Sequence, residues 1–149
     1  MRSETRWSGR AAAICFATPQ SLMLSRNSAF DAVFFSFWLS HVPPERFEEF
    51  WELVRRCLRE KGDRLEAYPT GRVFFIDSRR EPTSTAIDHC LPDPSTPVMR
   101  RLLNDGREFE VYKIFYEPAE LMQRLSELGW RFEIRQTERY FLYGAGELK

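Results

Sequence analysis

The chain has 149 residues, of which 43% are hydrophobic, and its 22 basic side chains balance 22 acidic ones. This length predicts a single domain, and a zero net charge gives no support for nucleic acid or an anionic membrane as a partner. No segment approaches the ~18 consecutive apolar residues of a membrane span. The cysteines, Cys15, Cys57 and Cys90, are odd in number and far apart, which argues against a disulfide framework and predicts a cytoplasmic protein.

Residues 1–28 contain no complete predicted element. Arginines precede the apolar stretch of residues 11–17, as in a signal peptide, but this stretch is very short and Pro19 follows it closely. We therefore expect residues 1–28 to be an irregular amino-terminal segment or a remnant of one.

The apolar run over residues 30–42 predicts a buried strand that ends in a binding crevice. Phe and Val occupy both faces of this run, which is typical of a central strand in a parallel α/β sheet covered on both sides. Ligands of such sheets bind outside the carboxyl ends of the strands. The residues that end this run are therefore the first place to expect a site.

A helix is predicted after Pro44 and a second strand at residues 72–77. The apolar residues of the helix recur at helical spacing and are Phe47, Phe50, Trp51, Val54 and Leu58. Acidic residues near its start and basic ones near its end suit the helix dipole, and Gly62 ends it. Strand, helix and strand form a crossover unit, which predicts two parallel neighbouring strands.

The second half of the chain predicts a long loop followed by further strands and a helix. Residues 78–105 lack a sustained period, although Val98 to Leu103 could add a short helix. Residues 107–116 are mostly strand-like, and a helix begins at Pro118 and is capped by Gly129. Two strands follow, at residues 130–135 and 140–143, and the last one is expected to end at residues 144–146.

Several motifs in this order resemble the carboxyl-terminal half of a class I S-adenosylmethionine-dependent methyltransferase. They are Phe30-Asp31-Ala32-Val33, Ser36-Phe37-Trp38-Leu39-Ser40-His41-Val42-Pro43, Gly71 to Ser78, Asn104 to Phe109, Phe115 to Leu121, Leu128-Gly129-Trp130 and Tyr140 to Gly144. The resemblance covers roughly residues 29–147. It implies an α/β fold with a Rossmann-like methyltransferase sheet, mainly parallel with an antiparallel last strand, in a partial domain over residues 29–149. It also implies S-adenosylmethionine as cofactor and a small-molecule methyl acceptor.

The resemblance leaves out the first half of the family's domain. The glycine-rich cofactor loop and the acidic ribose-binding residue belong to that half, and a strand-helix-strand unit takes ~30 residues or more. Residues 1–28 are too few to hold it, so we expect a truncated sheet in which residues 32–37 form an exposed apolar edge. Residues 61–71 also look like an insertion, relative to the family's tight turn.

The resemblance implies that Ser36, Phe37 and Trp38 line the cofactor and that His41 faces the substrate. An imidazole titrates near neutrality, so His41 is the best candidate for a base that removes the acceptor's proton. The alternative interpretation is equally open: the two aromatic residues belong to the core and His41 only caps a loop.

Three further residues are candidates for catalysis or substrate binding. Asp77, at the end of the second strand, could deprotonate or bind a substrate, or cap a turn. Arg79 could clamp an anionic acceptor, although a solvated charge is the more common role of arginine. Tyr116 is assigned to substrate binding through the resemblance. No metal is predicted, since the sequence Asp88-His89-Cys90 has no second cluster with ligand spacing.

Two functions follow from these expectations. The first is a truncated methyltransferase that acts on a small molecule with S-adenosylmethionine, either when another chain completes it or as the remnant of a longer gene product. The second is a non-catalytic methyltransferase-like module that pairs with a partner, either as a homodimer or with a complementing chain.

Overall fold

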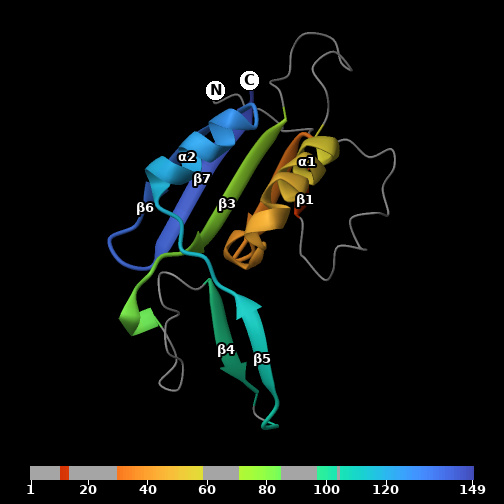
Figure 1. Ribbon diagram of the computed structural model, residues 1–149. Coiled ribbons are helices and arrows are strands. Elements are labelled where there is room, and N and C mark those ends of the chain that lie inside the picture. The colour runs from red at the N-terminus through yellow and green to blue at the C-terminus, as the bar shows by residue number, and fades with distance from the viewer. Residues whose placement is uncertain (1–10, 14–29, 59–70, 85–96, 104) are drawn as a thin grey trace, which may run out of the picture.

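The computed structural model describes residues 11–13, 30–58, 71–84, 97–103 and 105–149. The strands are β1 (Ala11–Ala13), β2 (Ala32–Ser36), β3 (Arg72–Ser78), β4 (Val98–Leu102), β5 (Glu108–Tyr112), β6 (Trp130–Gln136) and β7 (Phe141–Leu148). The helices are α1 (Phe47–Cys57) and α2 (Pro118–Glu127), with 3-10 turns η2 (Leu39–His41), η3 (Pro44–Arg46) and η4 (Pro82–Ser84) (Figure 1). Within these ranges no helix is both long and apolar enough to cross a membrane.

In the described part of the chain, five strands form one mixed sheet in the order β1-β2-β3-β7-β6. β1, β2 and β3 run parallel to one another, and the parallel pairing of β2 with β3 confirms the crossover predicted through α1. β7 runs antiparallel to both β3 and β6, which confirms the antiparallel last strand. Parallel and antiparallel pairings are equally frequent, so the prediction of a mainly parallel sheet overstated the parallel part.

β2 is not the edge of the sheet, contrary to the sequence prediction. β1 pairs along its outer side, from Ala11 opposite Ala32 to Ala13 opposite Phe34. The segment expected to be irregular therefore contains a strand. The outer side of β2 has backbone N–H and C=O groups to pair, and three small residues are enough to pair with them. The rest of residues 1–28 lies outside the described part of the chain.

The core lies between the sheet and the two helices, which cover the same face (Figure 1). Alternate strand residues point to this face, so Val33, Phe35, Val73 and Phe75 are all buried. The Phe35 ring stacks on Phe75 at 5.7 Å and meets Phe50 of α1 edge-to-face at 5.2 Å. All five apolar residues predicted on the inner side of the helix after Pro44 are buried, which confirms that prediction.

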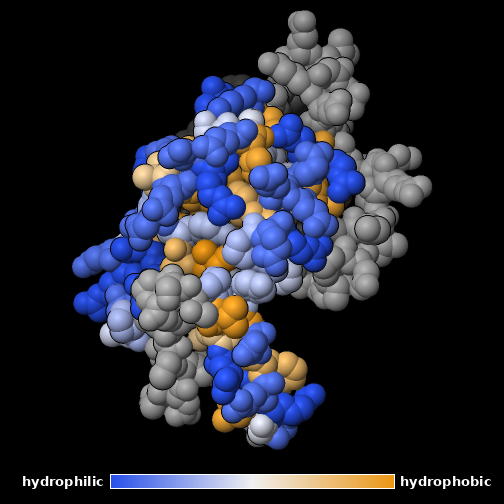
Figure 2. Space-filling view, in the orientation of Figure 1, coloured by the Kyte–Doolittle hydropathy of each residue, from blue (hydrophilic) through white to orange (hydrophobic). Residues whose placement is uncertain are grey.

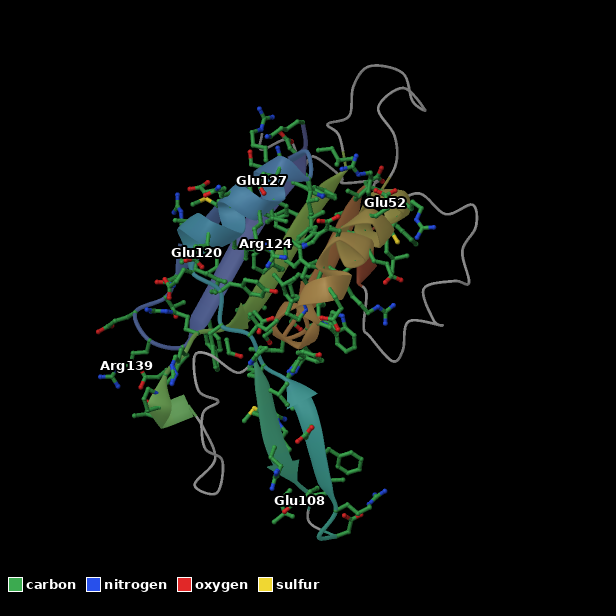
Figure 3. The ribbon with its side chains drawn as sticks, in the orientation of Figure 1. Glu52, Glu108, Glu120, Arg124, Glu127 and Arg139 are labelled. Atoms are coloured by element: carbon green, nitrogen blue, oxygen red, sulfur yellow. The ribbon has the colours of Figure 1, made fainter. Side chains whose placement is uncertain are left out.

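α2 packs beside α1 through an arginine as well as through its leucines. Leu121 and Leu125 are fully buried, and Arg124 lies on the side of α2 that faces α1 (Figure 3). Its guanidinium carbon is 3.8 Å from the centre of the Phe47 ring, a cation–π contact. Hydrophilic side chains cover the outer sides of both helices, with apolar residues between them (Figure 2).

The opposite face of the sheet exposes large apolar side chains. Phe34 is 44% exposed, and Phe74 and Tyr143 are each 40% exposed. Phe34 is paired in register with Phe74, so their side chains adjoin on this face. In the described ranges both helices lie on the other side, so the prediction that β2 is covered on both faces is wrong there.

β4 and β5 form a separate two-stranded antiparallel sheet that projects from the main body (Figure 1). Residues 98–103 therefore do not form the short helix allowed by the sequence. Cross-strand partners decide the conformation: Val98 pairs with Tyr112, and Arg100 lies 3.6 Å from the carboxylate of Glu108. Gly106, with φ of 84°, supplies the left-handed turn between the strands.

β7 continues through the glycines that were expected to end it. Gly144 lies opposite Phe75 of β3, and a Cβ built on it would be 2.6 Å from the Phe75 ring. The glycine thus makes room for a core aromatic ring instead of forming a turn, a role that a single sequence does not distinguish.

Candidate functional site

The parallel strands β2 and β3 end at the same edge of the sheet, where Ser36 lies opposite Ile76. The chain leaves β2 through Phe37 and Trp38 and enters the turn η2, which ends at His41. β3 reaches the same edge with Asp77 and Ser78. The structure therefore brings the predicted strand-end residues to one place, which we call the strand-end site: residues 36–41, 77–78 and 112–114.

Phe37 has an unusual backbone conformation at this site. Its φ is 52°, in the left-handed region that residues other than glycine rarely adopt. The backbone N–H of Phe37 donates to the carbonyl of Ile76 at 2.8 Å, and its ring, 47% exposed, meets Phe141 at 5.9 Å. Backbone strain of this kind is concentrated at functional sites.

The other two residues assigned to the cofactor lie on either side of Phe37 in the sequence but in different environments. Ser36 is exposed at the end of β2, whereas Trp38 is half-buried and packs against the core. The alternative interpretation of Trp38 as a core residue thus has a structural basis.

Asp77 is buried, with 1% exposure, and its carboxylate is held by the protein. Oδ2 accepts from the backbone N–H of Ser40 at 2.8 Å, and Oδ1 accepts from the backbone N–H of Ser78 at 2.7 Å. Lys113 Nζ lies 3.7 Å from Oδ1. These contacts hold the turn η2 against the end of β3. Asp77 therefore has the structural role of capping a turn.

Lys113 is a member of the site that sequence reasoning missed. It is only 8% exposed, and Nζ donates to Ser40 Oγ and Ser78 Oγ, each at 2.8 Å. Burial lowers the pKa of the Lys113 ammonium, while the Asp77 carboxylate opposes that shift. The available signal was a lone lysine among apolar residues 111–115, since a buried charge needs a partner.

His41 has a defined tautomer. Its Nδ1 lies 2.6 Å from the carbonyl oxygen of Tyr112, and a carbonyl oxygen only accepts, so Nδ1 carries the proton. In the neutral ring Nε2 is then the proton acceptor. Burial lowers the pKa of His41, the Tyr112 carbonyl and Asp77 oppose this, and Lys113 and Arg101 reinforce it. The imidazole is therefore mainly neutral at neutral pH, as a general base requires.

The two residues predicted to bind substrate are both engaged within the protein. The guanidinium of Arg79 donates to the carbonyl oxygens of Thr137 and Glu138, in the turn between β6 and β7. Tyr116 is buried beside Phe47, with ring centres 6.0 Å apart. Burial raises the pKa of Tyr116 to about 12, so the phenol stays protonated.

The described ranges contain no group of three or more His, Cys, Asp or Glu side chains that could hold a metal ion. The sequence Asp88-His89-Cys90 lies outside those ranges. Cys57 is a free thiol, and burial raises its pKa. A raised pKa disfavours the reactive thiolate.

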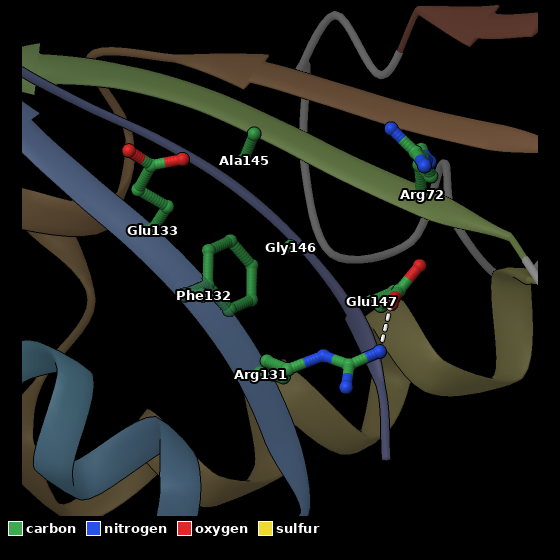
Figure 4. A pocket seen from close by; sticks show the side chains of 7 residues that line it. All are labelled: Arg72, Arg131, Phe132, Glu133, Ala145, Gly146 and Glu147. Atoms are coloured by element: carbon green, nitrogen blue, oxygen red, sulfur yellow. Dashed lines mark hydrogen bonds and ion pairs between the residues drawn. The ribbon is translucent and has the colours of Figure 1, made fainter.

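A cavity of about 310 Å³ lies away from the strand-end site (Figure 4). Its lining comprises Arg72, Arg131, Phe132, Glu133, Ala145, Gly146 and Glu147. Arg72 is the first residue of β3, so this cavity is at the opposite end of that strand from Asp77. An ion pair between Arg131 and Glu147 lies within it, and none of the residues predicted for function lines it.

Solved structures of methyltransferases are similar to this chain. A complex of DhpI with SAM and HEP is 35% identical, with a TM-score of 0.64, over 85% of this chain and 54% of that one. A DhpI complex with SAH is also 35% identical, with a TM-score of 0.62, over 85% and 51% of the two chains. The 1,6-didemethyltoxoflavin-N1-methyltransferase of Burkholderia thailandensis is 16% identical, with a TM-score of 0.52, over 86% and 48%.

The chain thus spans about half the length of the structures it matches. No family model matches it, and a search of curated proteins gives no match. The described residues have the methyltransferase-like α/β fold, with a mixed sheet and few helices.

Proposed function

We propose that the chain provides the acceptor-facing part of an S-adenosylmethionine-dependent methyltransferase that acts on a small molecule. The observation that carries the proposal is the 35% identity over 85% of this chain to DhpI, which has been solved with SAM and with SAH. The strand-end site supports it, because the predicted residues gather at the carboxyl ends of parallel strands, where α/β proteins bind ligands.

Ser36 and Phe37 would hold the cofactor. A ring face suits an adenine base and a hydroxyl suits a ribose, and both side chains are exposed at the end of β2. S-adenosylmethionine, when bound, supplies a methyl group on a sulfonium sulfur. In-line displacement requires the acceptor atom to be aligned with that methyl group, so positioning carries most of the rate enhancement.

His41 would act as the general base. An acceptor O–H or N–H loses a proton as its heteroatom bonds to the methyl carbon and the carbon–sulfur bond breaks. Nε2 of His41 would take that proton, because Nδ1 is already donating to Tyr112. Asp77 would act indirectly by holding η2, and Arg79 and Tyr116 would shape the surroundings through the contacts described above.

Calorimetric titration of the purified, monodisperse chain with S-adenosylmethionine tests the proposal. We expect micromolar binding that Phe37→Ala weakens at least about tenfold, a loss of about 1.4 kcal/mol. Phe34→Ala is the matched control, since Phe34 is a similarly exposed ring on the open face of β2, away from the strand-end site. A folded chain that binds no S-adenosylmethionine would overturn the proposal.

A pairing module is the second candidate function. The exposed face formed by Phe34, Phe74 and Tyr143 favours it, because monomeric proteins rarely leave adjoining aromatic side chains uncovered. The partner would be a second copy or a complementing chain. Light scattering of the pure protein tests whether the partner is a second copy. A monomer mass at high concentration would contradict a homodimer. If the protein is a dimer, Phe74→Ser should shift it toward monomer.

A further inference from the structure

We infer that Lys113 is a positioning residue that holds His41 in the form whose Nε2 accepts a proton. The inference rests on the proposed function for its catalytic meaning. Its structural content, the coupling of a buried lysine to the tautomer of a neighbouring histidine, is measurable without any activity.

Residues 112–114, at the end of β5, make hydrogen bonds to Ser40 and His41 of η2. We call this set of three hydrogen bonds the grip. The carbonyl of Tyr112 accepts from His41 Nδ1 at 2.6 Å, and Lys113 Nζ donates to Ser40 Oγ at 2.8 Å. The backbone N–H of Ile114 donates to the carbonyl of Ser40, also at 2.8 Å. Two segments more than 70 positions apart in the sequence are thus joined by three hydrogen bonds. One involves the imidazole, one the lysine side chain and one the backbone alone.

Lys113 also joins these two segments to the end of β3, beside the hydrogen bond from the Ser40 N–H to Asp77. Lys113 Nζ also donates to Ser78 Oγ at 2.8 Å and lies 3.7 Å from Asp77 Oδ1, both at the end of β3. One ammonium therefore spans the turn after β2, the end of β3 and the end of β5. The hairpin formed by β4 and β5 is only two strands wide, and such a sheet is marginally stable without an anchor.

The grip decides which ring nitrogen of His41 is protonated. In water the two neutral tautomers of histidine interconvert, and a hydrogen bond to one nitrogen selects between them. If Lys113 lost its hold on Ser40 and Ser78, the Tyr112 carbonyl would move relative to the His41 ring, and Nδ1 would lose its fixed acceptor.

The charge of Lys113 acts in the same direction. The charged groups that act on His41 in the described part of the chain are Lys113, Arg101 and Asp77, two cations and one carboxylate. Removal of Lys113 would leave Asp77 without its ion-pair partner and would favour the imidazolium. A protonated His41 has no lone pair with which to accept a proton.

Nitrogen-15 NMR of the histidine side chains tests the inference. The chain has two histidines, so a His89→Gln background leaves His41 as the sole signal. We expect the parent to show the tautomer protonated at Nδ1. Lys113→Met should give a mixture of tautomers and raise the pKa of His41, because a nearby cation disfavours the imidazolium.

Lys149→Met is the matched control, because Lys149 Nζ makes hydrogen bonds of 2.9 and 2.7 Å to Ser126 on the exposed surface. This variant should leave the His41 signals unchanged. If Lys113→Met does not fold, Ser40→Ala and Ser78→Ala remove the lysine's acceptors one at a time and should shift the His41 signals in the same direction.

A folded Lys113→Met, or the serine pair in its place, with the parent tautomer and pKa would overturn the inference. A chain that shows the expected NMR change but binds no S-adenosylmethionine would retain the inference and lose the proposed function. A chain that binds the cofactor but shows no NMR change would retain the proposed function and overturn the inference about Lys113.

Discussion

The backbone N–H of Ser40 donates to Asp77 Oδ2 at 2.8 Å, and so joins the turn after β2 to the end of β3. Residues 37 positions apart in the sequence thereby set the shape of the strand-end site. Since Asp77 also accepts from Ser78 and pairs with Lys113, one buried carboxylate organises most of the polar groups there.

Asp77→Asn should destabilise the protein by about 3 kcal/mol. The amide keeps an acceptor for Ser40 but leaves the Lys113 ammonium buried without a counter-charge, and breaking a buried pair from one side carries a cost of this size. Urea unfolding measures it. Asp105→Asn is the control, since it breaks an exposed 2.7 Å ion pair with Arg107 and should change stability little. Equal effects of the two substitutions would contradict the role given to Asp77.

Phe35→Ala and Phe34→Ala should differ sharply, although the residues are adjacent. Phe35 is fully buried among aromatic rings, so its removal leaves a cavity and should cost about 3–5 kcal/mol. Phe34 points to the exposed face, and its removal should cost about 1 kcal/mol or less. Thermal or urea unfolding of the two variants provides the comparison, and similar losses would mean that the exposed face is covered in solution.

Gly144→Ala should destabilise the protein by about 1–3 kcal/mol, because overpacking a full core forces side chains or backbone to shift. The added methyl would lie 2.6 Å from the ring of Phe75, which is itself stacked on Phe35. Ala145→Ser, one residue along and exposed on the other face of the sheet, should be nearly neutral. A neutral Gly144→Ala would show that β7 does not pass Phe75 this closely.

The stability of the protein should fall as the pH drops below about 6.5, in part through His41. The pKa of His41 is lowered in the folded state, so the unfolded chain binds a proton first. The contribution of His41 is complete above the unfolded pKa and is lost as the pH falls through the folded pKa. His41→Gln should remove this part of the pH dependence.

Urea unfolding of both proteins from about pH 8 to about pH 5, in the His89→Gln background, provides the test. The free-energy difference between parent and variant should shrink toward low pH. A difference that stays constant with pH would contradict a lowered pKa at His41.

The sequence predicted those parts of the fold whose signals are local. The spacing of Phe47 to Val54 on α1, and the run that forms β3 after it, were sufficient to predict a helix and two parallel strands. The sequence-based predictions were wrong where residues distant in the sequence determine the local structure. β4 is a strand because β5 pairs with it, and β7 continues through Gly144 because Phe75 needs the space.

The same limit applies to the site. The position of Ser36, Phe37 and His41 at a strand end follows from one continuous apolar run and the rule that ligands bind there. The role of Lys113 could not be predicted in this way, because its acceptors Ser40 and Ser78 lie in other elements, at η2 and at the end of β3. The tautomer of His41 likewise depends on a carbonyl 71 positions away in the sequence.

The most direct test of the account is a titration of the chain with S-adenosylhomocysteine, followed by the NMR shifts of assigned backbone amides. The account predicts saturable shifts at Ser36, Phe37 and His41, with little change at Arg72 and Arg131 around the distant cavity. A folded chain whose amides at the strand-end site do not respond, or that responds only around that cavity, would contradict the proposal that this site binds the cofactor.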